Sequence, residues 1–198
     1  MSAWLRPAGL LALALFALLS PLLLLLGALV LLDMGRPVLF RQRRSGQNGQ
    51  AFEMVKFRTM RDARDGRGLP LPDADRVTAL GRFLRRSRLD ELPELINIAR
   101  GDMDFVGPRP LLTETIRAMR QDGRLRGAVR PGLTGMAQVS GNTLLTVEEK
   151  LRFDLWYVRN RSAWLDAWII LRTLLVVVAG EKRINWHVDE ARPPHWGG

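Results

Sequence analysis

The stretch Ser87-Arg88-Leu89-Asp90-Glu91-Leu92-Pro93-Glu94-Leu95 sets two adjacent carboxylates at what its pattern predicts to be the start of a helix. With Asp90 as the N-cap, its side-chain oxygen would accept a hydrogen bond from a backbone N–H of the first turn. Pro93 would then lie in that turn, where its missing N–H has no intrahelical partner. Helical spacing predicts one apolar stripe, made of Leu92, Leu95, Ile96 and Ala99.

The pair Asp90-Glu91 has a purely structural interpretation. Acidic residues are common in the first turn of a helix, where they cap its end and interact favourably with its dipole. The pair also follows an arginine-rich segment, which makes it a candidate for chemistry on a negatively charged substrate. The rest of the chain has to decide between the two interpretations.

The composition narrows the class of protein. The chain has 198 residues, a formal net charge of +10 and no cysteine, which excludes disulfides and thiolate metal sites. His187 and His195 are the two histidines, so a histidine-rich zinc site or a Ser-His-Asp triad within the body of the fold is not expected. The positive charge suits a phosphate-bearing partner: nucleic acid, an anionic membrane surface or a nucleotide.

An uncharged run from Pro7 to Leu32, rich in Leu and Ala, predicts a membrane element. It is longer than the apolar core of a signal peptide and has no small-residue cleavage site. Ser20-Pro21 at its middle predicts a bend, because proline removes one helix hydrogen bond and Ser20 can bond a freed carbonyl. Arginines flank both ends, so the residues alone leave a simple span and a re-entrant hairpin open.

Two strand-like runs follow, at 37–42 and 51–58, and the Asn48-Gly49 between them predicts a β-hairpin. The second run carries Lys56, which is either a solvated strand end or a cation aimed at phosphate. Residues 61–75 predict a surface loop.

Helical patterns follow at 77–87, 111–126, 148–160 and 163–179. The first carries a basic face with Arg82, Arg85 and Arg86, which is either solvated or in contact with lipid headgroups or a nucleotide diphosphate. The last is strongly apolar but holds Asp166 and Arg172, which favours a helix lying in the membrane interface or packed in a core over a span.

Two loops constrained by proline and glycine each hold one arginine. Gly107, Pro108 and Pro110 stiffen the backbone around Arg109, and the segment 129–135 does the same around Arg130. A rigid backbone under an arginine fits a positioned ligand contact, although a structural turn explains it almost as well.

Five short motifs occur in order and together resemble the bacterial sugar transferase family, the monotopic phosphoglycosyl transferases, in particular its small catalytic-core members. The resemblance extends from about Ser20 to Thr173. The motifs are Lys56-Phe57-Arg58-Thr59-Met60, Asp90-Glu91-Leu92-Pro93-Glu94-Leu95-Ile96-Asn97, Gly101-Asp102-Met103, Val106-Gly107-Pro108-Arg109-Pro110 and Val129-Arg130-Pro131-Gly132-Leu133-Thr134-Gly135.

The resemblance implies a reaction. Such enzymes transfer a sugar-1-phosphate from a UDP-sugar to undecaprenyl phosphate with the help of Mg2+, and release UMP. By the match to the family's Asp-Glu dyad, Asp90 would attack the phosphorus nearest the sugar, form an aspartyl phosphosugar and contact Mg2+, and Glu91 would handle a proton or orient a group. The cations expected to bind phosphate or substrate are Lys56, Arg85, Arg109 and Arg130.

The resemblance also implies an architecture. The family's Ser-Pro motif matches Ser20 and Pro21, so we expect a re-entrant helix-break-helix over 1–35, a catalytic domain over 36–180 and a tail over 181–198. The expected fold class is α+β: a mainly helical cytosolic domain with a β-hairpin and interfacial amphipathic helices. The expected location is the cytoplasmic face of the bacterial inner membrane, in contact with membrane lipid.

One position departs from the family pattern, and some questions stay open. The family often has Gly-Arg-Asn where this chain has Gly141-Asn142-Thr143, so no particular sugar is expected. Met136 stands where tryptophan is common. The alternative function is a non-catalytic, membrane-anchored basic module that binds anionic lipid or nucleic acid. Nucleic acid is not expected, because no recognition motif is present. The oligomeric state is left open.

Overall fold

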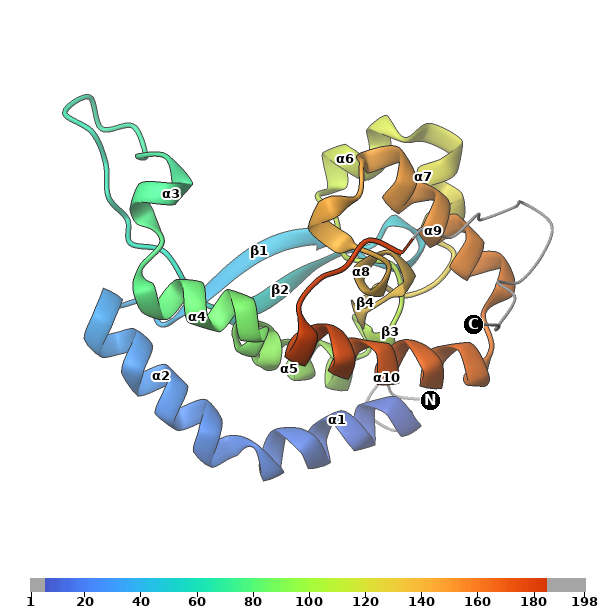
Figure 1. Cartoon of the computed structure of the whole chain (residues 1–198), viewed down its shortest axis with the longest axis horizontal. Coiled ribbons are helices and arrows are strands. Elements are labelled where there is room, and N and C mark those ends of the chain that lie inside the picture. The colour runs from blue at the N-terminus through green and yellow to red at the C-terminus, as the bar shows by residue number, and fades with distance from the viewer. Residues whose placement is uncertain (1–5, 185–198) are drawn as a thin grey trace. The chain divides into compact units, whose positions relative to one another are not determined.

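The computed structural model describes residues 6–184 (Figure 1). The chain forms two compact units. The first unit combines the N-terminal segment up to Gln42 with Glu53–Arg100. The second combines Arg43–Phe52 with the chain from Gly101 onward. The expected domain boundaries at 35 and 180 stay a prediction, and most of the expected tail, 185–198, lies outside the described residues.

The first unit begins with two helices that meet at a bend. Helix α1 spans Pro7–Leu18 and α2 spans Ser20–Met34, with 64° between them (Figure 1). The ring of Pro21 would collide with the carbonyl of Ala17 in a straight helix, and the Ser20 hydroxyl donates to that same carbonyl at 2.8 Å. The predicted bend is therefore confirmed.

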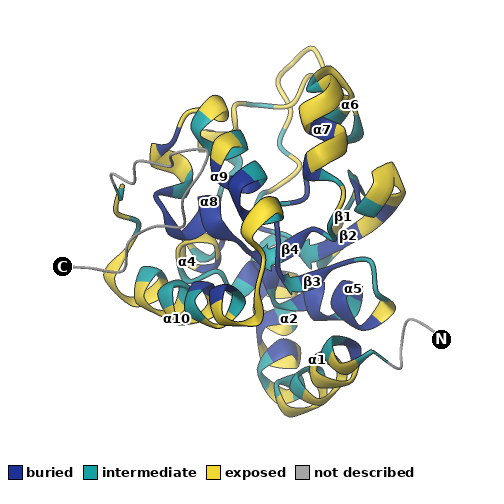
Figure 2. Cartoon of the chain, turned by 90° about the vertical axis from the view of Figure 1, so that its right-hand side faces the viewer, coloured by how far each residue is buried: buried dark blue, intermediate teal, exposed yellow. Residues whose placement is uncertain are grey.

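Within residues 6–184 no single helix is long and apolar enough to cross a membrane, while the bent pair α1–α2 meets these criteria of length and composition together. Several of its leucines face outward, and Leu18, Leu24 and Leu32 are each at least 74% exposed. Figure 2 shows exposed residues over much of α1. The inner side of α2 is buried with a strand and a helix of the same unit, in a cluster of Leu23, Leu26, Val30, Phe57 and Leu84.

The predicted hairpin is present. Strands β1 (Leu39–Ser45) and β2 (Ala51–Phe57) form a two-stranded sheet, which is antiparallel because so short a connection permits no crossover. The connection holds a short 3-10 turn, η2 (Gln47–Gly49), in which Asn48 has φ 53° and Gly49 has φ 77°. Asn and Gly are the residues that adopt this left-handed backbone at least cost.

Helices α3 (Asp73–Arg76) and α4 (Ala79–Ser87) follow the second strand. The Thr78 side chain caps α4 by accepting from the Gly81 N–H at 2.9 Å. A Cβ on Gly81 would lie 2.0 Å from the Thr59 carbonyl oxygen, so the helix packs against the end of the strand segment only because glycine stands there.

The acidic stretch differs from the prediction in one respect. A 3-10 helix, η3 (Leu89–Glu94), precedes α5 (Leu95–Arg100), and the residue before it is Arg88 in the left-handed conformation. Asp90 therefore lies inside the first turn, and its assignment as the N-cap was wrong. Pro93 lies inside this 3-10 helix, where it has no N–H to donate.

The apolar stripe that the sequence predicted along η3 and α5 makes up only part of the surface that these helices bury. Leu95 and Ala99 are buried as expected, but Leu92 and Ile96 are half-buried, and Asn97 and Ile98 are completely buried. The second turn of this element is thus enclosed on most sides.

The second unit contains a short parallel sheet that the sequence did not predict. Strand β3 (Asp104–Val106) pairs with β4 (Gly132–Thr134), with Asp104 opposite Gly132 and Val106 opposite Thr134. Helix 111–126 was expected as one element but is two, α6 (Thr113–Ala118) and α7 (Arg120–Arg126). A Cβ on Gly123 would lie 2.2 Å from the Ile116 carbonyl oxygen, so α7 turns back closely onto α6.

The rest of the second unit is helical: α8 (Met136–Val139), η4 (Asn142–Leu144), α9 (Val147–Asn160) and α10 (Ala163–Ala179). A capping box between Thr146 and Glu149 starts α9, and Ser162 caps α10. Buried side chains of α8, α9 and α10 form the core, including Phe153, Trp156 and Tyr157. The α+β fold class, mainly helical with a small hairpin, is confirmed.

Candidate active site

Three buried carboxylates lie on the 3-10 turn of the first unit. Asp90 is 9% exposed, Glu91 is 6% exposed and Glu94 is 2% exposed. Residues with charged side chains are seldom buried to this degree unless they are paired. The turn therefore needs cations close by.

Lys56 of β2 supplies one of them. Its ammonium nitrogen donates to the Oε1 of Glu91 at 2.7 Å and forms an ion pair with the Oε1 of Glu94 at 3.0 Å. Arg88 lies farther off, with its Nη1 3.7 Å from the Oε2 of Glu91. Lys56 has three N–H donors and donates one of them to Glu91, while its contact with Glu94 is an ion pair without a hydrogen bond. The fold thus places Lys56 beside both Glu91 and Glu94, and its role as a phosphate ligand stays a prediction.

Asn97 fixes the strand against the helix. It is fully buried, its Oδ1 accepts from the Val55 N–H at 3.1 Å, and its Nδ2 donates to the Glu53 carbonyl at 2.7 Å. These bonds bracket one residue of β2 and hold the strand at a fixed position along α5. Lys56, the next residue of the strand, is thereby aligned with the acidic turn.

The neighbouring arginines of the first unit make structural contacts. Arg85 donates through Nε to the Thr59 hydroxyl at 2.9 Å. Arg58 donates to the Met60 carbonyl at 2.8 Å and to the Arg36 carbonyl at 3.0 Å, just beyond the end of α2. Arg85 stays a predicted phosphate ligand, and Arg58 ties the strand end to the segment that leaves the bent helix pair.

In the second unit, the loops of Arg109 and Arg130 lie side by side. A Cβ on Gly107 would lie 2.4 Å from the Arg130 carbonyl oxygen, and a Cβ on Gly132 would lie 2.1 Å from the Gly107 nitrogen. The two glycines therefore let the backbones pair, with the Gly132 N–H donating to the Pro108 carbonyl at 3.1 Å. The proline and glycine content of both motifs serves this close approach.

Arg130 is oriented by its own unit. Its Nε donates to the Gly101 carbonyl at 3.0 Å, and its Nη1 lies 3.8 Å from the Oδ2 of Asp104. Asp104 is buried and also lies 3.6 Å from the Nη2 of Arg161. The sequence had singled out Arg130 but not the carboxylate beside it.

Tyr157 and Asp166 continue this polar network. The Tyr157 hydroxyl donates to the Oδ1 of Asp166 at 2.7 Å, and the Val106 carbonyl lies 3.2 Å from it. Burial raises the pKa of Tyr157, and the hydrogen bond to Asp166 raises it further. Burial also raises the pKa of Asp166, against the lowering effect of the tyrosine hydrogen bond and of Arg161.

A second buried pair, Arg126 and Asp154, joins α7 to α9. The Nε of Arg126 donates to the Oδ2 of Asp154 at 2.7 Å, and both side chains are 5% exposed. Burial raises the pKa of Asp154 even though the charge and hydrogen bond of Arg126 lower it.

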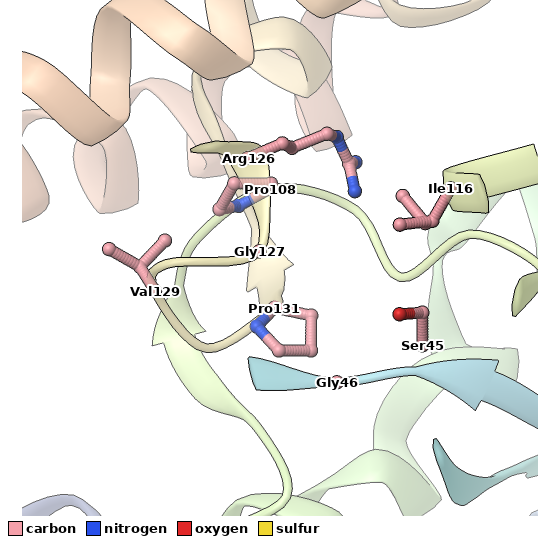
Figure 3. Close-up of a pocket in the computed structure, with 8 residues that line it drawn as sticks. All are labelled: Ser45, Gly46, Pro108, Ile116, Arg126, Gly127, Val129 and Pro131. Atoms are coloured by element: carbon pink, nitrogen blue, oxygen red, sulfur yellow. The ribbon is translucent and has the colours of Figure 1, made fainter. Parts of the chain in front are cut away.

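Arg126 also lines a small pocket of the second unit (Figure 3). Figure 3 shows its guanidinium on one side and Ser45, from the tip of the hairpin, on the other. The pocket has room for one water molecule at most, so in this conformation it does not accommodate a nucleotide.

Asn142 and Thr143, where this chain departs from the family pattern, are hydrogen-bonded to the segment that follows α10. The Glu181 carboxylate accepts from the Asn142 side-chain amide at 2.5 Å and from the Thr143 backbone N–H at 3.2 Å. The Ile184 N–H donates to the Ser140 carbonyl at 3.0 Å. Asn142 is thus part of a loop fixed by the same chain, with φ 43°.

The predicted site residues thus fall into two groups. Asp90, Glu91, Lys56 and Arg85 belong to the first unit, and Arg109 and Arg130 belong to the second. Sequence reasoning missed Glu94, Asn97 and Asp104. Glu94 and Asn97 lie within the recognised acidic motif, three and six residues after Glu91. This spacing could have indicated that they share a helix face with Glu91.

Comparisons with known proteins identify the family of this chain. The family model described as bacterial sugar transferase matches residues 8–180. The uncharacterized sugar transferase EpsL of Bacillus subtilis is 43% identical over 82% of this chain and 80% of its own length. The exopolysaccharide production protein ExoY of Sinorhizobium fredii is 38% identical over 83% of this chain and 80% of its own length.

A third relative has a more specific name. The UDP-glucose:undecaprenyl-phosphate glucose-1-phosphate transferase of Caulobacter vibrioides is 41% identical over 80% of this chain, which spans 63% of that protein. The family match covers the bent helix pair, the acidic turn and both arginine loops. The chain belongs to the bacterial sugar transferase family and is a transferase enzyme.

Proposed function

We propose that the enzyme transfers a sugar-1-phosphate from a UDP-sugar to undecaprenyl phosphate, giving undecaprenyl-diphosphate sugar and UMP. The names of the Caulobacter relative and of the undecaprenyl-phosphate galactose phosphotransferase of Salmonella typhimurium, 35% identical over 80% of this chain, support the donor and the acceptor. The chain spans 37% of the Salmonella protein. The observation that carries the proposal is the buried acidic turn held by Lys56. Membership of the family favours an enzyme over the non-catalytic basic module.

The reaction proceeds in two displacements at one phosphorus. An oxygen of the Asp90 carboxylate bonds to the phosphorus nearest the sugar, and the bond from that phosphorus to the UMP oxygen breaks, with its electron pair leaving on UMP. An oxygen of undecaprenyl phosphate then attacks the same phosphorus and releases the Asp90 carboxylate. Both leaving groups are anions, so neither step requires a strong acid, and charge neutralisation matters most.

Mg2+ fits the donor set of the turn. Its preferred ligands are oxygens, usually one or two carboxylates together with substrate phosphates, and Asp90 is the proposed protein ligand. Within residues 6–184 no group of three or more His, Cys, Asp or Glu side chains could hold a metal by itself. When bound, Mg2+ would neutralise the phosphate charge.

Each unit has its own proposed phosphate-binding cations. A guanidinium can hold two phosphate oxygens at once, and Arg109 and Arg130 stand on loops stiffened by proline. Gly101 and Asp104 restrict the side chain of Arg130, so less ordering is required when a phosphate binds. Arg85 and Lys56 are the corresponding cations of the acidic turn.

The membrane attachment is proposed to be a re-entrant α1–α2 pair, with both flanks on the cytoplasmic side. The 64° bend and the Ser20–Ala17 hydrogen bond support it. The chain has no cysteine, so Ala3→Cys and Gln50→Cys can be labelled separately. Both should react only from the cytoplasmic side, and reaction of Ala3→Cys from outside would establish a span. Pro21→Ala should straighten the pair and expose residue 3 outside.

Helix α10 is proposed to rest in the lipid interface. It buries Leu165 and Ile169 and exposes Trp164, Leu174 and Val178, the last at 88%. Leu174→Glu should lower the fraction of the enzyme recovered with membranes, because it places a charge on the apolar face. If Leu174→Glu is recovered with membranes as fully as the wild type, α10 does not contribute to membrane binding.

The decisive experiment incubates the purified enzyme with a panel of UDP-sugars and undecaprenyl phosphate. Release of UMP with one of them, and a protein adduct of the mass of a sugar phosphate in the absence of lipid, are expected. Asp90→Asn should lower UMP release at least about 1000-fold and abolish the adduct, because it removes the nucleophile. Full activity of Asp90→Asn would show that another group attacks.

A further inference from the structure

We infer that Glu94 is a positioning residue for this reaction: through Lys56 it holds the carboxylate of Glu91 in place beside Asp90. The inference rests on the proposed function of the acidic turn. It assigns a role to a third carboxylate that neither touches the phosphorus nor replaces a member of the dyad.

The helix type places Glu91 and Glu94 on one face. Both lie in the 3-10 helix Leu89–Glu94, and a 3-10 helix has three residues per turn, so side chains three apart eclipse each other. The two carboxylates therefore lie one above the other and meet the same ammonium group, at 2.7 Å and 3.0 Å. Asp90 is one residue away and projects in a different direction from the helix axis.

The burial of the three side chains makes this arrangement rigid. The side chain of Glu94 is 3% exposed, that of Glu91 is 8% exposed and that of Lys56 is 13% exposed. A lysine ends in a compact charge on a flexible four-carbon chain, so a single ionic contact would hold it poorly. With both glutamates, its ammonium is fixed from two sides.

The strand that carries Lys56 is fixed independently of the ion pairs. The two hydrogen bonds of Asn97 to Val55 and Glu53 hold β2 against α5. Loss of Glu94 should therefore leave the strand in place, while the lysine side chain loses one of its two anionic neighbours. Glu91 would keep a partner that can move, and its orientation beside Asp90 would be less well defined.

The kinetic test compares Glu94→Ala, Glu94→Gln and the wild type under conditions where UMP release is linear. In Glu94→Ala we expect kcat to fall about tenfold, with KM for the UDP-sugar within about twofold, because the loss affects alignment of the reacting group. Glu94→Gln keeps an oxygen near Lys56 without the charge and should fall about threefold. Glu114→Ala, an exposed glutamate of α6, is the matched control and should equal the wild type.

A second readout follows Lys56 itself. The chain has three lysines, Lys56, Lys150 and Lys182, so reaction with an amine-reactive ester can be quantified at each by peptide mass spectrometry. In Glu94→Ala the labelling rate of Lys56 should rise about fivefold or more, since the freed side chain can reach solvent. Lys182, which is exposed, should react equally in all variants.

The outcomes separate the inference from the proposed function. A wild type that releases no UMP with any UDP-sugar overturns the proposed function. An active wild type with an unimpaired Glu94→Ala, or with Lys56 labelled at the wild-type rate in that variant, overturns only the role of Glu94. If Glu94→Ala does not fold, Glu94→Gln decides: a kcat equal to that of the wild type overturns the inference, and a selective fall in kcat with faster labelling of Lys56 supports it.

Discussion

Each unit of the molecule buries a cluster of opposite charges, and the two clusters are built differently. In the second unit Arg126 forms an ion pair with Asp154 at 2.7 Å, with both side chains 5% exposed, and also donates to the Arg109 carbonyl. In the first unit Lys56 is shared by Glu91 and Glu94, and Asp90 is buried on the same turn. In the second unit one cation pairs with one anion, whereas in the first unit one lysine pairs with two carboxylates and Arg88 lies 3.7 Å from one of them.

We interpret the Arg126–Asp154 pair as structural and the acidic turn with Lys56 as the candidate catalytic site. A balanced pair that is buried and hydrogen-bonded needs no further partner, and it tolerates no loss of either member. A turn rich in carboxylates attracts cations, and Mg2+ together with a charged substrate is the proposed complement. The following changes test this contrast, beginning with the largest expected effect.

Asp154→Ala should destabilise the protein by about 3–5 kcal/mol, because it leaves the Arg126 guanidinium buried without its carboxylate. The free energy of unfolding, followed by tryptophan fluorescence in detergent and urea, measures the loss. The double variant Arg126→Met, Asp154→Leu is the control and should regain most of the stability, because both charges are gone. A loss below about 1 kcal/mol in Asp154→Ala would show that the pair does not hold α7 to α9.

Glu91→Gln should lower kcat about 100-fold, equivalent to about 2.7 kcal/mol in the activation barrier, while cooperative unfolding is retained. The variant keeps the shape of the side chain and loses its charge, so chemistry should suffer more than the fold. The measurement is UMP release beside a thermal unfolding curve. Turnover equal to that of the wild type would reduce Glu91 to a structural residue like Asp154.

The single tyrosine, Tyr157, gives a pH test of the second unit. Its pKa is raised above the ordinary value of 10.0 by burial and by its hydrogen bond to Asp166. A raised pKa means that the protonated folded form is favoured, so this stabilisation is complete below pH 10 and is lost as the pH rises above 10. The slope should approach about 1.4 kcal/mol per pH unit.

The tyrosinate absorbance reports this group without interference from any other tyrosine. It should appear only together with unfolding, and Tyr157→Phe should remove the alkaline dependence. Ionisation of Tyr157 near pH 10 in the folded protein would contradict the burial of the network.

The smallest effect is expected at the surface pair of the first unit. Arg41 lies 3.0 Å from Glu53, with side chains 62% and 48% exposed. Glu53→Ala should change the free energy of unfolding by less than about 1 kcal/mol, because water screens an exposed pair. Urea unfolding measures it, and a loss comparable to that of Asp154→Ala would break the argument that burial decides the strength of these pairs.

The sequence predicted the local features well. The bend at Ser20-Pro21, the turn at Asn48-Gly49 and helix α10 stand where the pattern placed them. Each depends on residues a few positions apart, whose backbone preferences are intrinsic. The family and the position of the acidic motif also followed from short motifs in order.

The sequence did not predict the partners of the site. The bonds of Asn97 to Val55 and Glu53 bridge 42 and 44 residues, and the ion pair of Lys56 with Glu91 bridges 35. The 3-10 form of the turn was also missed, because Asp90 satisfied the rules for a cap and Pro93 satisfied the rules for a first turn. The local sequence rules are compatible with Asp90 as the N-cap and also with the observed start at Leu89.

The amino-acid sequence by itself determined where the chain bends, turns and caps its helices, and which motifs it carries, because these follow from the chemistry of neighbouring residues. The tertiary structure alone decided which charges share a partner. That choice depends on how a strand and a helix distant in sequence are aligned, here by the buried Asn97. The alignment joins Lys56 to two glutamates rather than one, and so distinguishes the acidic turn from an ordinary helix start.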